Sequence, residues 1–162
     1  MELLSPRLRL RLLPLEEMRA LLEGRADDAP WAAGYPLDAT LVAVAMQTDL
    51  ADRGLALEPF GHFQLIRRED GAVIGDIGFH HPPDELGEVS VGFGIVPEAR
   101  GRGYAVEALR TLLDWALARP EVRSVHADTD LVNLASQRVL VAAGMRLIAD
   151  EGDRKVFEIT AQ

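Results

Sequence analysis

The feature that most constrains the fold is the stretch VPEARGRGYAVEALRTLL, residues 96 to 113, where a hydrophobic strand-like run meets an amphipathic segment through a loop of arginine and glycine. This spacing predicts a helix from about Gly103 to Ala118 that packs one face on a sheet and stops before Pro120. The apolar residues that recur at the i, i+3, i+4, i+7 spacing are Ala105, Ala108, Leu109, Leu112, Leu113 and Ala116.

The loop before this helix has the composition of an anion site. A helix amino terminus leaves about four backbone N–H groups without internal partners, and the peptide dipoles add partial positive charge there. Gly101 and Gly103 let an anion approach the backbone, and Arg100 and Arg102 add forked donors that suit phosphate oxygens. The alternative is an exposed strand-to-helix turn with solvated charges, and a glycine pair alone favours that alternative.

The strand before the loop, EVSVGFGIV at residues 88 to 96, favours the anion site over the exposed turn. Gly92 and Gly94 lie inside it, and glycine within a strand often marks a bulge or a place where a ligand lies against the backbone. A bared strand that runs into an anion-binding helix start suits an extended ligand with phosphates at one end. Coenzyme A is such a ligand, because the amides of its pantetheine arm can pair like an extra strand.

Two other phosphate-binding motifs do not fit the loop. A P-loop needs Lys followed by Ser or Thr after its glycines, and Tyr104 follows Gly103 here. A dinucleotide fingerprint that starts at Gly101 requires Gly or Ala at position 106, where this chain has Val106.

The remaining pattern predicts one domain, residues 1–162, with a mixed α/β (α+β) sheet. Strand-like segments come first as a run and then alternate with helical segments. The segment at residues 25–59 is expected to hold a second helix and loops. We expect strands at residues 7–13, 60–68, 72–80, 88–96, 122–130, 146–150 and 154–159, and further helices at residues 15–24 and 133–144.

Two motifs, one in the glycine–arginine loop and one in the helical segment at residues 133–144, resemble those of the GCN5-related N-acetyltransferase (GNAT) family. Arg100-Gly101-Arg102-Gly103-Tyr104-Ala105 matches its Arg/Gln-x-x-Gly-x-Gly/Ala pyrophosphate loop, between strand and helix. NLASQRVLVAAGM, residues 133 to 145, is similar to the Asn-x-x-Ser segment of the branch that acetylates ribosomal proteins, the RimJ/RimL type. The resemblance covers nearly the whole chain.

The resemblance implies a mostly antiparallel sheet of six to seven strands, flanked by about four helices and splayed between its fourth and fifth strands. Acetyl-CoA would lie in that gap as cosubstrate, and its acetyl group would pass directly to an amine. The residues implied to bind the coenzyme are Phe93, Ile95, Val96, Arg100, Gly101, Arg102, Gly103, Tyr104, Ala105, Asn133 and Arg138.

The chemistry needs a base for the amine, donors for the oxyanion and a proton for the thiolate. Backbone amides around Phe93 to Val96 are the expected oxyanion donors. Many relatives have a tyrosine on the later helix as the acid, but Leu140 stands there and leaves Ser136 as the candidate. Relatives often have a glutamate where Ser90 stands, so Ser90 is a candidate catalytic residue by position. Glu88, two residues earlier on the same strand face, is the candidate base.

Each of these roles has an alternative that the sequence leaves open. Ser136 could only bond backbone or coenzyme, Asn133 could cap its helix or contact the ligand, and Arg138 could simply be exposed. Glu88 could be a solvated residue at a strand start. His80 and His81 could line the mouth of the acceptor site or be surface residues.

Composition narrows the classes of function. With no cysteine, the chain has no disulfide framework, thiolate zinc site or cysteine nucleophile, and no other spacing suggests a metal site. A net charge of −9 argues against nucleic-acid binding; it suits cationic substrates, or serves only solubility. We expect a cytoplasmic protein, because the alternating Leu and Arg of MELLSPRLRLRLLP form neither a signal peptide nor a membrane span.

We therefore predict an acetyl-CoA-dependent N-acetyltransferase whose partner is a small-molecule or peptide amine, as monomer or homodimer. The acceptor stays open between protein amino termini, antibiotics, polyamines and amino acids. Its pocket is expected to come from residues 25–59 and the loop HHPPDELG. The alternative is a non-catalytic acyl-CoA-binding or interaction module on the same fold, followed by a purely structural domain.

Overall fold

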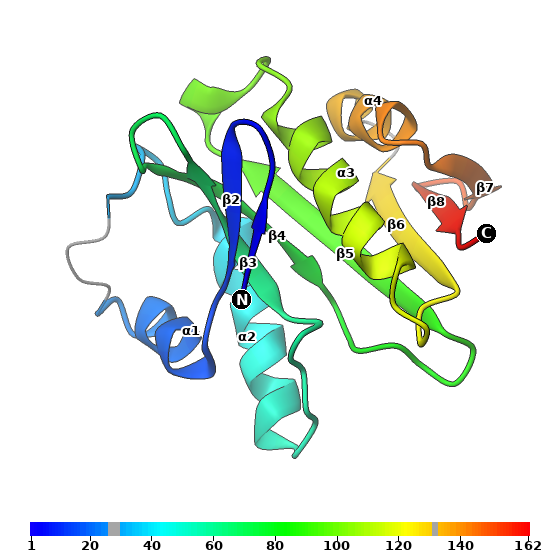
Figure 1. Cartoon of the computed structure of the whole chain (residues 1–162), viewed down its shortest axis with the longest axis horizontal. Coiled ribbons are helices and arrows are strands. Elements are labelled where there is room, and N and C mark those ends of the chain that lie inside the picture. The colour runs from blue at the N-terminus through cyan, green and yellow to red at the C-terminus, as the bar shows by residue number, and fades with distance from the viewer. Residues whose placement is uncertain (26–29, 131–132) are drawn as a thin grey trace.

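The protein is built around one eight-stranded sheet (Figure 1). The structure, a computed structural model, describes residues 1–25, 30–130 and 133–162. Neighbouring strands are antiparallel except for β5 and β6, which run parallel. In spatial order the strands are β1 (Glu2–Leu4), β2 (Leu8–Leu12), β3 (His62–Arg67), β4 (Val73–Phe79), β5 (Glu88–Ile95), β6 (Ser124–Asp130), β8 (Arg154–Thr160) and β7 (Arg146–Asp150).

The mixed, mostly antiparallel sheet confirms the predicted fold class, but it has eight strands where six to seven were predicted. The strand that the sequence did not show is β1, which pairs with β2 from Glu2↔Arg11 to Leu4↔Arg9. It has three residues, too few for an alternating pattern to be visible. Six of the other strands lie within the predicted segments, and β8 extends one residue beyond its predicted end, to Thr160.

Four α-helices surround the sheet in the described part of the chain, as expected. They are α1 (Leu15–Leu22), α2 (Asp38–Asp52), α3 (Tyr104–Leu117) and α4 (Leu134–Ala142), and a short 3-10 turn, η1 (Pro97–Ala99), precedes α3. The second helix predicted somewhere within residues 25–59 is α2. Residues 26–29 of that segment, and residues 131–132 before α4, lie outside the described residues.

The two faces of the sheet are covered by different helices. On one face, Leu10, Phe63 and Ile77 pack in a core with the buried side of α3. Side chains alternate along a strand, so Gln64 and Asp76 project from the other face, where α2 lies. Figure 1 shows α3 along β5, with α1 and α2 beside each other.

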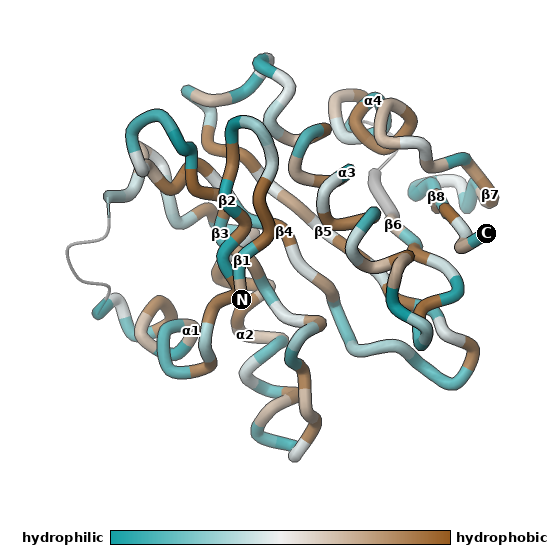
Figure 2. The backbone as a smooth tube through the Cα atoms, in the orientation of Figure 1, coloured by the Kyte–Doolittle hydropathy of each residue, from teal (hydrophilic) through white to brown (hydrophobic). Residues whose placement is uncertain are grey.

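Hydropathy follows this arrangement. Figure 2 shows hydrophobic residues along the central strands and hydrophilic residues at the turn between β3 and β4. The buried face of α3 agrees with the predicted one at all but two positions: Ala105 is only half-buried, and Tyr104 is buried in addition. The buried residues are Tyr104, Ala108, Leu109, Leu112, Leu113 and Ala116. Burial of this stripe fixes where α3 begins over the sheet, and with it the position of the glycine–arginine loop.

Candidate functional site

Strand β5 is paired along one side but only at its start on the other. It pairs with β4 from Phe79↔Val91 to Gly75↔Ile95. With β6 it pairs only from Glu88↔Ser124 to Ser90↔His126. Beyond that point β6 continues its pairing with β8, so a gap opens along the second half of β5. These are the fourth and fifth of the predicted strands, and the predicted splay between them is confirmed.

A cavity of about 550 Å³ lies at the end of this gap, against the start of α3. Gly101 and Gly103 have φ values of 76° and 81°, in the left-handed region that glycine adopts without strain. Gly103 is the N-cap residue of α3 and has no side chain to satisfy the first-turn N–H groups. The loop therefore leaves the positive end of the helix for another acceptor, as an anion site requires.

Most residues predicted to bind the coenzyme line this cavity, although they come from β5, the loop, α3 and α4. We call it the coenzyme-side cavity after that prediction. The predicted acid, Ser136, lines it as well. The predicted residues that line the cavity are Phe93, Ile95, Arg100, Gly101, Gly103, Tyr104, Ala105, Asn133, Ser136 and Arg138.

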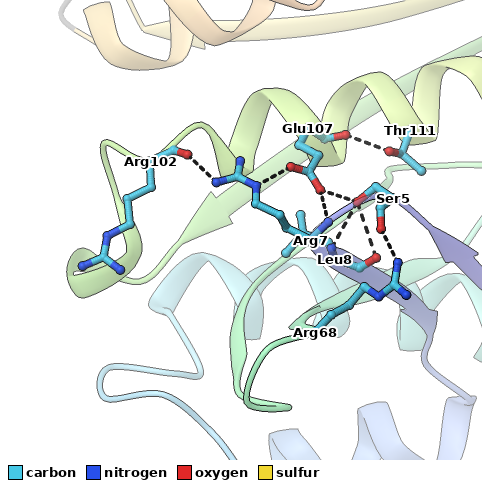
Figure 3. Close-up of polar contacts among 7 residues, drawn as sticks. All are labelled: Ser5, Arg7, Leu8, Arg68, Arg102, Glu107 and Thr111. Atoms are coloured by element: carbon cyan, nitrogen blue, oxygen red, sulfur yellow. Dashed lines mark hydrogen bonds and ion pairs between the residues drawn. The ribbon is translucent and has the colours of Figure 1, made fainter.

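Two predicted residues, Val96 and Arg102, are not among the lining residues. Val96 is fully buried, and its amide donates to the carbonyl of Ile74 at 2.9 Å, so this N–H is not available to an oxyanion. Figure 3 shows the Arg102 guanidinium directed away from α3. Arg100 is placed differently: its Nε donates to the carbonyl of Ile95 at 2.8 Å and ties the loop to the end of β5.

Arg7, about a hundred residues earlier in the chain, braces the loop from the side. Its Nε donates to Glu107 Oε1 at 2.7 Å, and its Nη1 donates to the Arg102 carbonyl at 2.9 Å (Figure 3). The guanidinium also lies 4.3 Å from the centre of the Tyr104 ring. A Cβ at Gly103 would lie 3.4 Å from Arg7 Nη2, so Arg7 adds positive charge next to the loop.

Glu107 connects this brace to the first turn of α3. The Ser5 hydroxyl donates to Glu107 Oε2 at 2.6 Å, and the Arg7 amide donates to the same atom at 2.8 Å. Burial alone would raise the pKa of Glu107, but the hydrogen bonds from Ser5 and Arg7 outweigh it and hold the pKa below its ordinary value of 4.5. Local sequence patterns missed this network, because its members are distant in the chain.

Helix α4 closes the other side of the coenzyme-side cavity. The Asn133 side-chain oxygen accepts from the Ser136 amide at 3.1 Å, which is an N-cap bond. Asn133 therefore caps the helix while it also lines the cavity. Leu140, which stands where many relatives have a tyrosine, is buried in the core and offers no proton donor.

A second cavity, of about 350 Å³, lies on the other face of the sheet under α2. Phe93 lines both cavities, so they meet at β5 where β6 departs from it. The predicted loop HHPPDELG contributes His80 alone, while α2 supplies the roof. The lining residues are Ala39, Val42, Ala43, Met46, Gln47, His62, Asp76, Gly78, Phe79, His80, Gly92 and Phe93.

The inner end of this cavity under α2 holds buried polar groups that the sequence pattern did not single out. The Asp76 carboxylate accepts a hydrogen bond from the Thr40 hydroxyl and lies 3.4 Å from His62 Nε2. The side chains of His62 and Asp76 are 4% and 5% exposed. Burial, and then the charge of Asp76, raise the pKa of the Tyr35 hydroxyl, which therefore stays protonated.

Two polar atoms in this cavity have no hydrogen-bond partner among the described residues, His62 Nε2 and Gln47 Oε1. The Gln47 amide nitrogen donates to the Phe79 carbonyl, which orients the oxygen. Buried polar atoms are usually paired, because an unpaired one costs about 1–3 kcal/mol. Two unpaired buried atoms on residues that line a cavity are therefore typical of a ligand site.

Paired glycines make room for two histidine rings on this face. Gly78 lies opposite Gly92 across β4 and β5. A Cβ at Gly78 would come within 2.7 Å of His62 Nδ1, and a Cβ at Gly92 within 2.9 Å of His80 Nε2. His80 Nδ1 lies 3.1 Å from the Ser90 hydroxyl, which directs the other ring nitrogen toward Gly92.

The predicted base residues lie to one side of this arrangement. Glu88 is at the start of β5, lines neither cavity, and its amide donates to Asp84 Oδ1. Ser90 lines neither cavity but contacts His80. His81 is turned to the Pro82 carbonyl and is not a lining residue.

Comparison with known proteins is consistent with this geometry. Residues 7–146 match the family described as acetyltransferase (GNAT) domain. The chain therefore belongs to the GNAT acetyltransferase family.

Two curated relatives are named as uncharacterised N-acetyltransferases. YjdG of Bacillus subtilis is 34% identical over 88 residues, which cover 54% of this chain and 52% of the relative. The chain thus matches about half the length of that relative. Protein p20 of Bacillus licheniformis is 27% identical over 141 residues, covering 85% of this chain and 78% of the relative.

Solved structures of ribosomal-protein acetyltransferases share the fold. RimL, an acetyltransferase of ribosomal protein L7/L12 in complex with coenzyme A, has a TM-score of 0.70 at 17% identity, over 99% of this chain and 98% of that chain. The ribosomal-protein-S5-alanine acetyltransferase of Vibrio fischeri has a TM-score of 0.70 at 16% identity, over 100% and 97%. At such identities the likeness concerns the fold.

Two kinds of feature are absent from the described residues. Within residues 1–25, 30–130 and 133–162, no helix is both long and apolar enough to span a bilayer. Over the same residues, histidine, aspartate and glutamate form no group of three or more that could hold a metal ion.

Proposed function

We propose that this protein transfers the acetyl group of acetyl-CoA to a primary amine. The observation that carries the proposal is the meeting of two cavities at β5, one against an uncapped helix start and the other against buried polar groups. Coenzyme A in the RimL structure supports the identity of the donor. Membership of the GNAT family supports the reaction class.

The residues of the coenzyme-side cavity fit the two ends of the donor. Gly101, Gly103 and the first turn of α3 would hold the pyrophosphate, with charge from Arg100 and Arg138. The backbone of β5, unpaired toward β6 after Ser90, would pair with the pantetheine amides. Arg102 would add charge only at longer range.

The reaction requires that the amine lose a proton before it attacks. When bound, acetyl-CoA supplies a thioester: the amine nitrogen forms a C–N bond to its carbonyl carbon, the C–S bond breaks, and the thiolate takes up a proton. We assign the first proton to His80 Nε2, because Ser90 orients this ring over Gly92 beside the junction of the cavities. Glu88 would act through water and His80, and Ser136 would return a proton to the thiolate.

The proposal is tested first by binding. Acetyl-CoA should raise the Tm of the protein, and Gly103→Glu should abolish the shift, because it puts a carboxylate against the anion site and strains a left-handed residue. The matched control is Gly54→Glu: Gly54 also has a left-handed φ, 88°, and an added Cβ there meets nothing within 4 Å. The same loss of shift in both variants would contradict the assigned site.

Turnover separates catalysis from the alternative, a module that only binds acyl-CoA. Free thiol should accumulate when acetyl-CoA and a primary amine are both present, and mass spectrometry should show the amine gaining one acetyl group. A Tm shift without thiol release for any amine would favour the binding module. No shift at saturating acetyl-CoA would exclude both.

A further inference from the structure

We propose that the cavity under α2 binds a small primary monoamine with an apolar body, whose ammonium group lies between Asp76, His62 and Gln47. This inference rests on the proposed acetyl transfer and names the class of acceptor. It follows from three features of the cavity: its unpaired acceptors, its charge and its rim.

The hydrogen-bonding atoms at the inner end match an ammonium group. An ammonium has three donors and no acceptor. The Asp76 carboxylate and the unpaired Gln47 Oε1 are acceptors, and His62 Nε2 is a third in the tautomer protonated at Nδ1. A ligand with acceptors there, such as a carboxylate, would face the Asp76 charge.

The charge of the inner end has the Thr40 hydroxyl and the His62 ring beside it, but no permanently charged cation among the described residues that line the cavity. Asp76 is almost fully buried and is bonded by Thr40, but the described lining residues of the cavity include no lysine or arginine. A buried carboxylate is costly unless a cation offsets it. A bound ammonium would supply that cation.

The outer end favours an apolar body. Val42 and Met46 lie one helical turn apart on α2, line the cavity, and are 61% and 49% exposed. The other residues of the roof near them, Ala39 and Ala43, are also apolar. An apolar group that covers these side chains removes them from water.

The same rim disfavours two other amine classes. A peptide would lay its amide groups against side chains that carry no hydrogen-bonding atom, which is unfavourable once water is excluded. A polyamine would need a second anionic group, and Asp76 is the one carboxylate among the described lining residues. The volume of about 350 Å³ is in the range of small-molecule sites.

The placement also agrees with the proposed chemistry. The His62 ring lies over Gly78 and the His80 ring over Gly92, and these two glycines face each other across β4 and β5. An ammonium held beside His62 therefore lies toward the junction with the coenzyme-side cavity. His80 Nε2 accepts its proton there before attack.

The test compares three acceptors with the full chain and acetyl-CoA: 2-phenylethylamine, spermidine, and a hexapeptide with a free N-terminal alanine. Thiol release should give 2-phenylethylamine the highest kcat/KM. Asp76→Asn keeps the shape and the Thr40 contact but removes the charge, so KM for this amine should rise about tenfold or more. The Tm shift with acetyl-CoA should not change.

Asp114→Asn is the matched control, because Asp114 is an exposed carboxylate on α3 that lines neither cavity. If Asp76→Asn does not fold, Met46→Glu at the rim provides a second test. That variant should reduce kcat/KM for 2-phenylethylamine relative to ethylamine, because it makes the apolar rim polar.

The outcomes distinguish this inference from the proposed function. Preference for the peptide or for spermidine, or an unchanged KM in Asp76→Asn, would overturn the amine class while acetyl transfer stands. Thiol release with none of the three amines, nor with a wider amine panel, would instead count against acetyl transfer itself.

Discussion

The two cavities that meet at β5 are built in different ways. The coenzyme-side cavity is made chiefly by one continuous piece of chain, from Phe93 through the glycine–arginine loop into α3, completed by α4. The cavity under α2 draws single residues from α2, β3, β4 and β5, far apart in sequence. The first includes the glycines of the loop and the start of α3, and the second has buried polar side chains at its inner end. In the proposed function, the first would hold the donor and the second the acceptor.

This comparison is tested most strongly by removing the proposed proton acceptor. His80→Ala should lower kcat by about 10²–10⁴-fold, the usual range for a general base, while the Tm shift with acetyl-CoA stays the same. His81→Ala is the control, since His81 faces the Pro82 carbonyl. Stopped thiol release in both variants, or a lost Tm shift in His80→Ala, would show that the cavities are not functionally separate.

Ser90→Ala sharpens the same point. It removes the hydroxyl 3.1 Å from His80 Nδ1 and leaves the ring in place, so kcat should fall by a smaller factor, about tenfold. KM for the amine should stay nearly unchanged, because Ser90 does not line the cavity. A rise in KM with unchanged kcat would assign Ser90 to substrate binding instead.

The difference between the cavities also explains what the sequence could predict. Helix period, glycine placement and the loop motif are local, so α3, the splay at β5 and most of the coenzyme-side residues were predictable. Asp76 and His62 belong to different strands and carry no local pattern. Their meeting depends on the register of β3 with β4, and on Thr40 at the start of α2, which a single sequence does not show.

Arg7 tests whether the coenzyme-side cavity really depends on one piece of chain. Arg7→Ala removes the contacts to Glu107, Tyr104 and the Arg102 carbonyl, so the loop loses its brace and a nearby positive charge. The Kd for acetyl-CoA, measured by calorimetry, should rise about tenfold or less, and KM for the amine should not change. Arg9→Ala is the control: Arg9 is two residues away and pairs with Glu2.

A dependence on pH should accompany this brace, and it is the smallest expected effect. The pKa of Glu107 is lower in the folded state than in the unfolded state, where it is near 4.5. The ionised carboxylate therefore stabilises the fold fully above the unfolded-state pKa. This stabilisation is lost as the pH falls through the folded-state pKa. Urea unfolding of the wild type and Glu107→Gln at pH 7, 5 and 3.5 should show a difference in unfolding free energy that is present at pH 7 and 5 and shrinks at pH 3.5. A difference that grew toward low pH would mean that burial, rather than Ser5 and Arg7, controls this carboxylate. In that case the loop would be held by its own backbone, and the contrast between the two cavities would be sharper still.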